Sequence, residues 1–152
     1  MADEHEVRLC SAGDAVAAEL HMPTGASRFH LRRYSQQVAG QSQYLLAWAG
    51  GKTVGHLNLL GKSKYPEVTV RLGDFPEMNA LGVNESLWGR GIGTALIHAA
   101  EQLAQKAGAV RVGLAVGVTN DRADRLYEHL GYAQEKAIAL VDVWDWTDPQ
   151  GV

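Results

Sequence analysis

The sequence predicts one domain over residues 1–152 with a mixed α/β fold, in which helices pack on a single sheet. In the first half of the chain, two apolar runs flank Gly50-Gly51, a pair that is typical of the turn in an antiparallel hairpin. In the second half, amphipathic helical segments alternate with runs rich in valine and leucine, and each helical segment ends at a glycine. Alternating helices and strands of this kind form a layered structure around one sheet.

Each element follows from the periodicity of the apolar residues and from the residues that interrupt it. Residues 92–107 carry apolar side chains at helical spacing, and Gly108 ends that helix. Gly13-Asp14 offers a turn and an N-cap for a first helix that runs to Leu20. The remaining helices are expected at 26–38 and 121–130. Strands are expected at 6–10, 43–49, 53–60, 77–83, 109–118 and 137–146, the last range holding one strand or two.

Two segments have less regular patterns. Residues 61–76 alternate Val68, Val70 and Leu72 between turn signals, which favours a loop or a short extra strand. Residues 109–118 carry valine and leucine on one face, and on the other face every residue except Arg111 is small. A strand face without bulk is typical of a place where another group approaches the backbone, so we expect a close neighbour there.

Composition and charge exclude several classes of protein. The chain is 46% hydrophobic and 20% charged, as in an ordinary globular domain. A net charge of −3 without a basic block argues against nucleic-acid binding, and no apolar run reaches the ~18–20 residues of a membrane span. Cys10 is the only cysteine, which excludes a disulfide scaffold. The histidines lack metal-binding spacing, so we expect no metal. The N-terminus lacks the layout of a signal peptide, so we expect a cytoplasmic protein.

A glycine-rich segment, residues 88–94 (WGRGIGT), lies between an expected strand and an expected helix. Its three glycines uncover backbone N–H groups at a helix N-terminus, where the helix dipole is positive, and this combination binds phosphate. Arg90 adds a positive charge. The alternative is a turn that only begins the helix. No lysine follows Gly93 as in a P-loop, and the spacing does not match the dinucleotide-binding pattern G-x-G-x-x-G.

A second pattern follows the expected strand at 109–118. Its residues are Asn120, Ala123, Leu126, Tyr127, Leu130, Gly131 and Tyr132. Together the two patterns resemble the GNAT superfamily of acyl-CoA-dependent N-acetyltransferases, whose signatures are Gln/Arg-x-x-Gly-x-Gly/Ala and Asn-x-x-Ala-x-x-Leu-Tyr followed by Leu-Gly-Tyr/Phe. Trp88 departs from the first signature, which removes a side-chain role there but leaves the backbone amides in place. A helix, a glycine-capped turn and a strand separate the two motifs, as in the family.

The resemblance implies a GNAT-like fold with a central, mostly antiparallel sheet of about six or seven strands, about four helices, and a parallel, splayed strand pair at the cofactor site. It implies that an amine directly attacks acetyl-CoA in a ternary complex and receives the acetyl group. Cys10 lies away from both motifs, which argues against a covalent cysteine intermediate. Two alternatives stay open: a non-catalytic acyl-CoA-binding or sensor domain, and an O-acetyltransferase.

The resemblance also implies catalytic residues. Tyr127 is the candidate acid that protonates the leaving thiolate, against a role in packing only. Glu77 is the candidate general base. Strand alternation places Glu77 on one face with Leu81 and Val83, and burial on that face raises the pKa of a carboxyl. The alternatives are that Glu77 lies exposed at the start of the strand, or that Glu85 is the base.

The cofactor contacts implied by the family are mostly backbone contacts. Leu81, Gly82 and Val83 are expected to pair with the pantetheine amides and to polarise the thioester carbonyl. Asn120 is expected to contact the pantetheine arm or to cap the helix that follows it. The loop residues expected at the pyrophosphate are Gly89, Arg90, Gly91, Ile92, Gly93 and Thr94.

The acceptor is less specified, and we expect a small-molecule amine or a peptide amine. His56 and Asn58 share one face of the strand at 53–60. That face either lines the acceptor cleft or is the wet side of a half-exposed sheet. The sequence also leaves open whether the chain forms a homodimer.

Overall fold

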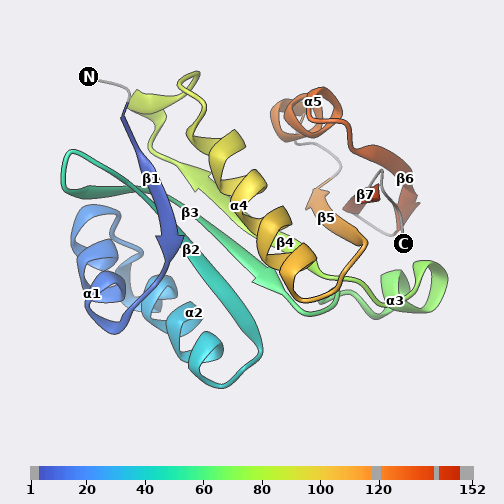
Figure 1. Ribbon diagram of the computed structural model, residues 1–152, viewed down its shortest axis with the longest axis horizontal. Helices are drawn as coiled ribbons and strands as arrows, with labels where there is room; N and C mark the ends of the chain where they lie inside the picture. The colour runs from blue at the N-terminus through green and yellow to red at the C-terminus, as the bar shows by residue number, and fades with distance from the viewer. Residues whose placement is uncertain (1–3, 118–120, 139–140, 148–152) are drawn as a thin grey trace. The chain divides into compact units, whose positions relative to one another are not determined.

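A computed structural model describes the chain at residues 4–117, 121–138 and 141–147 (Figure 1). The chain forms two compact units. The first unit comprises Met1–Leu59 and Ala80–Ala100, and the second comprises Leu60–Asn79 and Glu101–Val152. Strand β4 (Glu77–Val83) and helix α4 (Ile92–Lys106) have residues in both units, and the last residue of β3, Leu60, belongs to the second unit. Among the described residues, no helix is long and apolar enough to cross a membrane. The single domain expected over 1–152 stays a prediction.

The first unit contains the strands β1, β2 and β3 and the later residues of β4, in that order in the sheet. Strand β1 pairs with β2 in antiparallel register, from Glu6↔Trp48 to Leu9↔Leu45. Besides its parts of β4 and α4, the elements of this unit are β1 (Glu6–Leu9), α1 (Ala12–His21), α2 (Phe29–Val38), β2 (Ser42–Ala49) and β3 (Lys52–Leu60), with 3₁₀ turns at Gly25–Ser27 and Glu85–Leu87.

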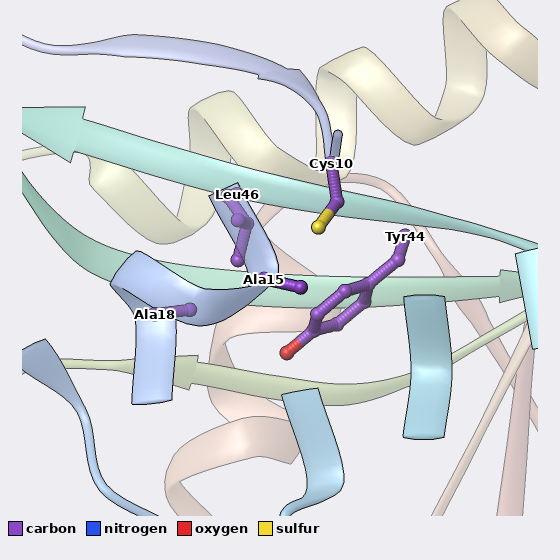
Figure 2. Packing of buried hydrophobic residues seen from close by; sticks show 5 residues of the cluster. All are labelled: Cys10, Ala15, Ala18, Tyr44 and Leu46. Carbon is purple, nitrogen blue, oxygen red and sulfur yellow. The ribbon is translucent and has the colours of Figure 1, made fainter. Parts of the chain in front are cut away.

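One hydrophobic core of the first unit lies between β2 and the two N-terminal helices. Figure 2 shows its buried side chains Cys10, Ala15, Ala18, Tyr44 and Leu46 gathered in one place. Alanine on two successive turns of α1 lets the helix backbone approach the sheet, and the ring of Tyr44 fills the space beside it. Burial of a large apolar side chain such as Leu46 stabilises the fold by about 1.5–3 kcal/mol.

Helix α1 begins one turn earlier than the sequence pattern predicted. The Ser11 hydroxyl accepts a hydrogen bond from the Asp14 N–H at 3.2 Å, and the Asp14 carboxylate accepts one from the Ser11 N–H at 3.1 Å. This reciprocal pair is a capping box. The prediction of a cap at Gly13-Asp14 was therefore wrong, because Asp14 acts from the third position inside the helix.

Helix α2 begins at Phe29, three residues later than predicted, because Glu19 and Thr24 set its first turn. The Thr24 hydroxyl donates to Glu19 Oε1 at 2.6 Å and accepts from the Phe29 N–H at 2.8 Å. Glu19 Oε2 accepts from the His30 N–H at 2.9 Å. These bonds satisfy N–H groups that no earlier turn of the helix can reach.

The second unit contains the first residues of β4 and then β5, β7 and β6, in that order in the sheet. Strands β4 and β5 are parallel, with the residue pairs Glu77↔Gly113 and Met78↔Leu114. Strand β7 pairs antiparallel with β5 and with β6, and the β6 register shifts between Glu135 and Ile138. Besides its parts of β4 and α4, this unit holds α3 (Pro66–Leu72), β5 (Arg111–Gly117), α5 (Asp121–His129), β6 (Ala133–Ile138) and β7 (Val141–Thr147).

The predicted fold class is confirmed: the chain has a mixed α/β fold whose described strand pairs include antiparallel ones and the parallel pair of β4 with β5. Seven strands occur in the described part of the chain, within the predicted range. The parallel pair is joined by only two residue pairs although each strand is seven residues long, as expected for strands that splay apart. Strand β6 begins at Ala133, four residues before the predicted start, directly after the glycine turn that ends α5.

Helix α3 occupies the segment that the valine alternation predicted as a loop or a short strand. The described residues therefore form five α-helices, where about four were predicted. Pro66 stands at the first helical position, where its missing N–H costs nothing. Val68 is buried and Leu72, four residues on, packs against the same small core, whereas Val70 is 83% exposed. The apolar spacing that matters is therefore the helical one, and the strand interpretation was wrong.

The close neighbour predicted beside the small face of β5 is Phe75. A Cβ placed on Gly113 would lie 2.3 Å from Cε2 of that ring, so only glycine fits. The Arg111 guanidinium lies 4.4 Å from the centre of the same ring and donates to the Leu72 carbonyl at 3.0 Å. The segment after α3 is thereby fastened to β5.

Replacing Gly113 with alanine is expected to lower the free energy of unfolding by about 1–3 kcal/mol, because the new methyl group must displace the Phe75 ring. Chemical denaturation measures this loss. Gly61→Ala is the matched control, since an added Cβ there meets no atom within 4 Å. Adding Phe75→Leu to Gly113→Ala should restore part of the loss. Equal stability of the two single alanine variants would contradict this packing.

Candidate functional site

The glycine loop of the first unit leads directly into the N-terminus of α4. Gly89 and Gly91 have φ values of +81° and +84°, a backbone conformation that favours glycine. A Cβ added at either residue would meet nothing within 4 Å, so no described part of the protein fills that space. The first bond of α4 runs from the Ala95 N–H to the Gly91 carbonyl at 2.9 Å. Of the other predicted loop residues, Arg90 is exposed, Gly93 and Thr94 are half-buried, and Ile92 is buried.

Such a loop can bind an anion through backbone groups, because the first N–H groups of a helix have no partner within the helix. Trp88, the residue that departs from the family signature, fastens the loop to the preceding strand. Its indole N–H donates to the Val83 carbonyl at 2.9 Å, while 45% of the side chain stays exposed. The structure therefore brings the glycine loop and the end of β4 together within one unit.

Strand β4 contains a local distortion immediately before its predicted cofactor-binding residues. Ala80 has φ = +56°, a left-handed conformation that costs a non-glycine residue roughly 1–2 kcal/mol. The predicted alternation of faces along 77–83 assumes a regular strand, and that regularity is interrupted at this residue. Leu81, Gly82 and Val83 follow it and are all half-buried.

His56, on β3, was expected to line the acceptor cleft or a wet face of the sheet, and its contact with β4 was not predicted. A Cβ on Gly82 would lie 2.5 Å from His56 Nε2, so the ring packs directly on the β4 backbone. The Ala80 backbone interacts with the ring in the direction that raises the pKa of His56. Burial, together with His30 and Arg33 nearby, lowers the pKa of His56 to about 4. The signal available in the sequence was the polar pair at 56 and 58 on one face of an otherwise apolar strand.

That face of β3 is covered by α2, so it is not the wet side of the sheet. The His56 ring lies 5.3 Å from the ring of His30 and 6.3 Å from that of Tyr44, measured between centroids. His30 is fully buried, and its Nε2 donates to the Met22 carbonyl at 2.8 Å, so Nδ1 accepts the hydrogen bond of the Tyr44 hydroxyl. Asn58 is 3% exposed and its Oδ1 has no partner in the described part of the chain.

Glu77 lies in the second unit and is 1% exposed, so the alternative of an exposed strand start is wrong. Its Oε1 accepts from the Ser63 hydroxyl at 2.6 Å and its Oε2 from the Lys64 N–H at 3.1 Å. Burial raises the pKa of the Glu77 carboxyl, and these hydrogen bonds oppose that shift without reversing it. Each carboxylate oxygen keeps a further lone pair, so the group can still accept a proton. Glu85, the alternative base, is exposed.

Tyr127, also in the second unit, is 3% exposed, and burial raises the pKa of its hydroxyl to about 12. Its ring lies 6.2 Å from that of Tyr132. The Tyr132 hydroxyl donates to Glu101 Oε2 at 2.6 Å, which makes it a structural anchor. The second motif therefore places two buried tyrosines side by side. Asn120 lies outside the described residues.

Comparisons with known proteins agree with this arrangement. The PaiA N-acetyltransferase of Thermoplasma acidophilum, solved in complex with coenzyme A, has a TM-score of 0.71 at 15% identity over 95% of this chain and 99% of that chain. An aminoglycoside antibiotic 6'-N-acetyltransferase of Acinetobacter haemolyticus has a TM-score of 0.73 at 16% identity over 88% of this chain and 94% of that chain. At these identities the likeness shows the shared fold.

Sequence comparison gives the family. An uncharacterised N-acetyltransferase of Methanocaldococcus jannaschii is 40% identical over 62 residues, which are 41% of this chain and 27% of that protein. The match therefore spans little more than a quarter of that relative. The sequence model of the acetyltransferase (GNAT) family matches residues 14–132. Because this span is well over half of the sequence, and because both sequence motifs and the fold agree with it, the chain belongs to the acetyltransferase (GNAT) family.

Proposed function

We propose that this chain transfers an acetyl group from acetyl-CoA to an amine, by direct attack of the amine on the thioester in a ternary complex. The observation that carries the proposal is the glycine loop. Two left-handed glycines uncover the N-terminus of a 15-residue helix, and the loop is tied to β4 through Trp88. Membership of the family supports acyl transfer in general, and this loop supports an anionic donor such as the CoA pyrophosphate.

The donor half of the proposed site is built from backbone groups. The amides of residues 89–94 bind the pyrophosphate, and Arg90 adds charge from an exposed position. The backbone of Leu81, Gly82 and Val83 pairs with the pantetheine arm. Its N–H groups stabilise the oxyanion that forms when the thioester carbonyl is attacked. Asn120 contacts the pantetheine arm in this proposal.

The chemistry requires one proton acceptor and one proton donor. The amine nitrogen bonds to the carbonyl carbon, the carbon–sulfur bond breaks, and the sulfur leaves as a thiolate. Glu77 takes the proton that the amine loses, for which its raised pKa suits it. Tyr127 donates a proton to the thiolate, and with a pKa of about 12 it holds that proton throughout the neutral range.

The acceptor in this proposal is the amine of a small molecule or of a peptide. The aminoglycoside acetyltransferase with the same fold makes aminoglycosides one class to test. A panel of aminoglycosides, polyamines, amino acids and peptide N-termini, with CoA release as the readout, identifies the class. Acetyl-ester products would show an O-acetyltransferase. Binding of acetyl-CoA without turnover on any acceptor would favour a sensor domain.

Acetyl-CoA is expected to stabilise the fold by about 2.7 kcal/mol at a hundredfold excess over its dissociation constant, because it binds the folded chain only. Gly91→Ala should remove most of this stabilisation in a thermal-shift assay, since alanine disfavours the left-handed backbone of the loop. Gly108→Ala is the matched control: its φ is +90° and its space is open, but it lies at the other end of α4. No stabilisation of the parent protein would overturn the donor assignment.

Glu77→Gln is expected to lower turnover by roughly 10²–10⁴, the usual contribution of a general base, while the affinity for acetyl-CoA stays nearly unchanged. Steady-state kinetics and calorimetry measure the two quantities. The loss should shrink at high pH, where the amine is already neutral. Glu85→Gln serves as the comparison. Turnover of Glu77→Gln within a factor of about two of the parent, or a larger loss in Glu85→Gln, would place the base elsewhere.

Tyr127→Phe removes one buried hydroxyl and keeps the ring. We expect turnover to fall by roughly 10²–10⁴, because the thiolate leaves without its proton donor, while acetyl-CoA still binds. Tyr132→Phe is the matched control, since it removes the neighbouring buried hydroxyl. It should lower stability through the lost bond to Glu101 and leave turnover in place. If both variants keep parental turnover, Tyr127 is a packing residue.

A further inference from the structure

The strained residue Ala80 requires an explanation in its surroundings. A left-handed alanine inside a strand persists only where neighbouring groups hold it, and such outliers gather at functional sites. Three half-buried residues of β4 follow it directly: Leu81, Gly82 and Val83. A change in the Ala80 backbone would turn the N–H groups of these residues to a different direction.

Strand β3 supplies the groups that hold Ala80. The His56 ring interacts with the Ala80 backbone, and its Nε2 would lie only 2.5 Å from a Cβ on Gly82. The preceding residue, Gly55, leaves room for the Gly82 carbonyl oxygen, which would be 3.1 Å from a Cβ there. Asn84 continues the contact by donating its N–H to the Val54 carbonyl at 2.8 Å. The backbone from Ala80 to Asn84 is therefore held against β3. The left-handed distortion at its start, Ala80, is called the β4 bulge below.

The contact of His56 with β4 leaves one of its ring nitrogens buried without a hydrogen-bond partner among the described residues. This nitrogen is Nδ1, and a buried nitrogen without a partner destabilises a fold. The neighbouring donors are already used. The His30 N–H donates to the Met22 carbonyl, and the Tyr44 hydroxyl donates to His30 Nδ1. Arg33 adds positive charge from α2, which keeps the imidazole neutral. A leucine at this position would avoid the unpaired nitrogen but would lose the polar interaction with the Ala80 backbone.

We propose that His56 is a positioning residue, which holds the β4 bulge at Ala80 so that the N–H groups of Leu81 to Val83 face the thioester arm of acetyl-CoA. A neutral imidazole carries one N–H. Since Nδ1 has no partner among the described residues, we place the N–H on Nε2, directed at the Ala80 backbone. This inference rests on the proposed function, because the bulge matters for catalysis only if β4 binds the donor.

The test compares His56→Leu, which keeps volume but removes the donor, with His56→Gln, whose amide N–H reaches a place similar to that of Nε2. We expect kcat/KM for acetyl-CoA to fall by about 10²-fold in His56→Leu, the cost of displacing reacting groups by about 1 Å, and to recover by at least about tenfold in His56→Gln. The loss should appear in kcat more than in KM, because the oxyanion forms only during reaction. His98→Leu, on the exposed face of α4, is the matched control.

A second variant keeps the test decisive if His56→Leu is unstable. Adding Ala80→Gly to His56→Leu should restore much of kcat, since glycine adopts the left-handed conformation without a side-chain penalty. A merely structural role of His56 would change the melting temperature without this rescue. The proposal is overturned if His56→Leu keeps kcat/KM within about twofold, or if the double variant is no more active than His56→Leu.

The parent protein separates this inference from the proposed function. If the parent neither binds nor turns over acetyl-CoA, the proposed function fails and with it the catalytic purpose of the bulge. Amide and Cα chemical shifts of Ala80 would still show whether His56→Leu releases the left-handed conformation. If the parent is active and these shifts do not change in His56→Leu, the positioning role alone is wrong.

Discussion

The close approach of β3 and β4 is the constraint on which the first unit depends. At Gly55 a side chain would crowd the Gly82 carbonyl and Leu96 of α4, whose Cδ1 would lie 3.2 Å from the added Cβ. The missing side chain therefore lets α4 settle on one face of β3, while the adjacent His56 turns toward α2 on the other. Because the glycine loop leads into α4, this packing also fixes where the loop and the β4 edge stand relative to each other.

The second unit solves a different problem, the burial of a carboxyl group. Glu77 is enclosed, and its oxygens are satisfied by Ser63 and by the Lys64 backbone, which belong to the segment before α3. That segment is held by packing of Val68 and Phe75, and Phe75 in turn occupies the space left by Gly113. Helix α3, which the valine alternation did not predict, therefore helps to hold the segment that binds the carboxylate of Glu77, the proposed base.

Prediction from sequence succeeded where local rules decide the outcome. The limits of β4 and the start of α4 agree with the patterns at 77–83 and 92–107 because strand alternation, helical spacing and glycine punctuation all act within a few residues. It failed at Ala80, where His56 on another strand holds a conformation that alanine disfavours. The candidate residues were found through two motifs, whereas the role of His56 rests on contacts between distant positions that no local pattern records.

Burial acts in the same direction on three titratable groups, and the consequences differ. It favours the neutral form of each, so Tyr127 keeps its proton to about pH 12 and His56 stays without its second proton down to about pH 4. For Glu77 the neutral form is the protonated one, so its pKa rises. Between the ordinary carboxyl pKa and the raised one, Glu77 stays protonated in the folded chain but loses its proton in the unfolded chain. The free energy of unfolding therefore falls as the pH increases through this range, and the ionised Glu77 destabilises the fold. The unfavourable free energy of burying the ionised carboxylate also raises its affinity for a proton. The burial that weakens the fold at neutral pH is therefore what would make Glu77 an effective base.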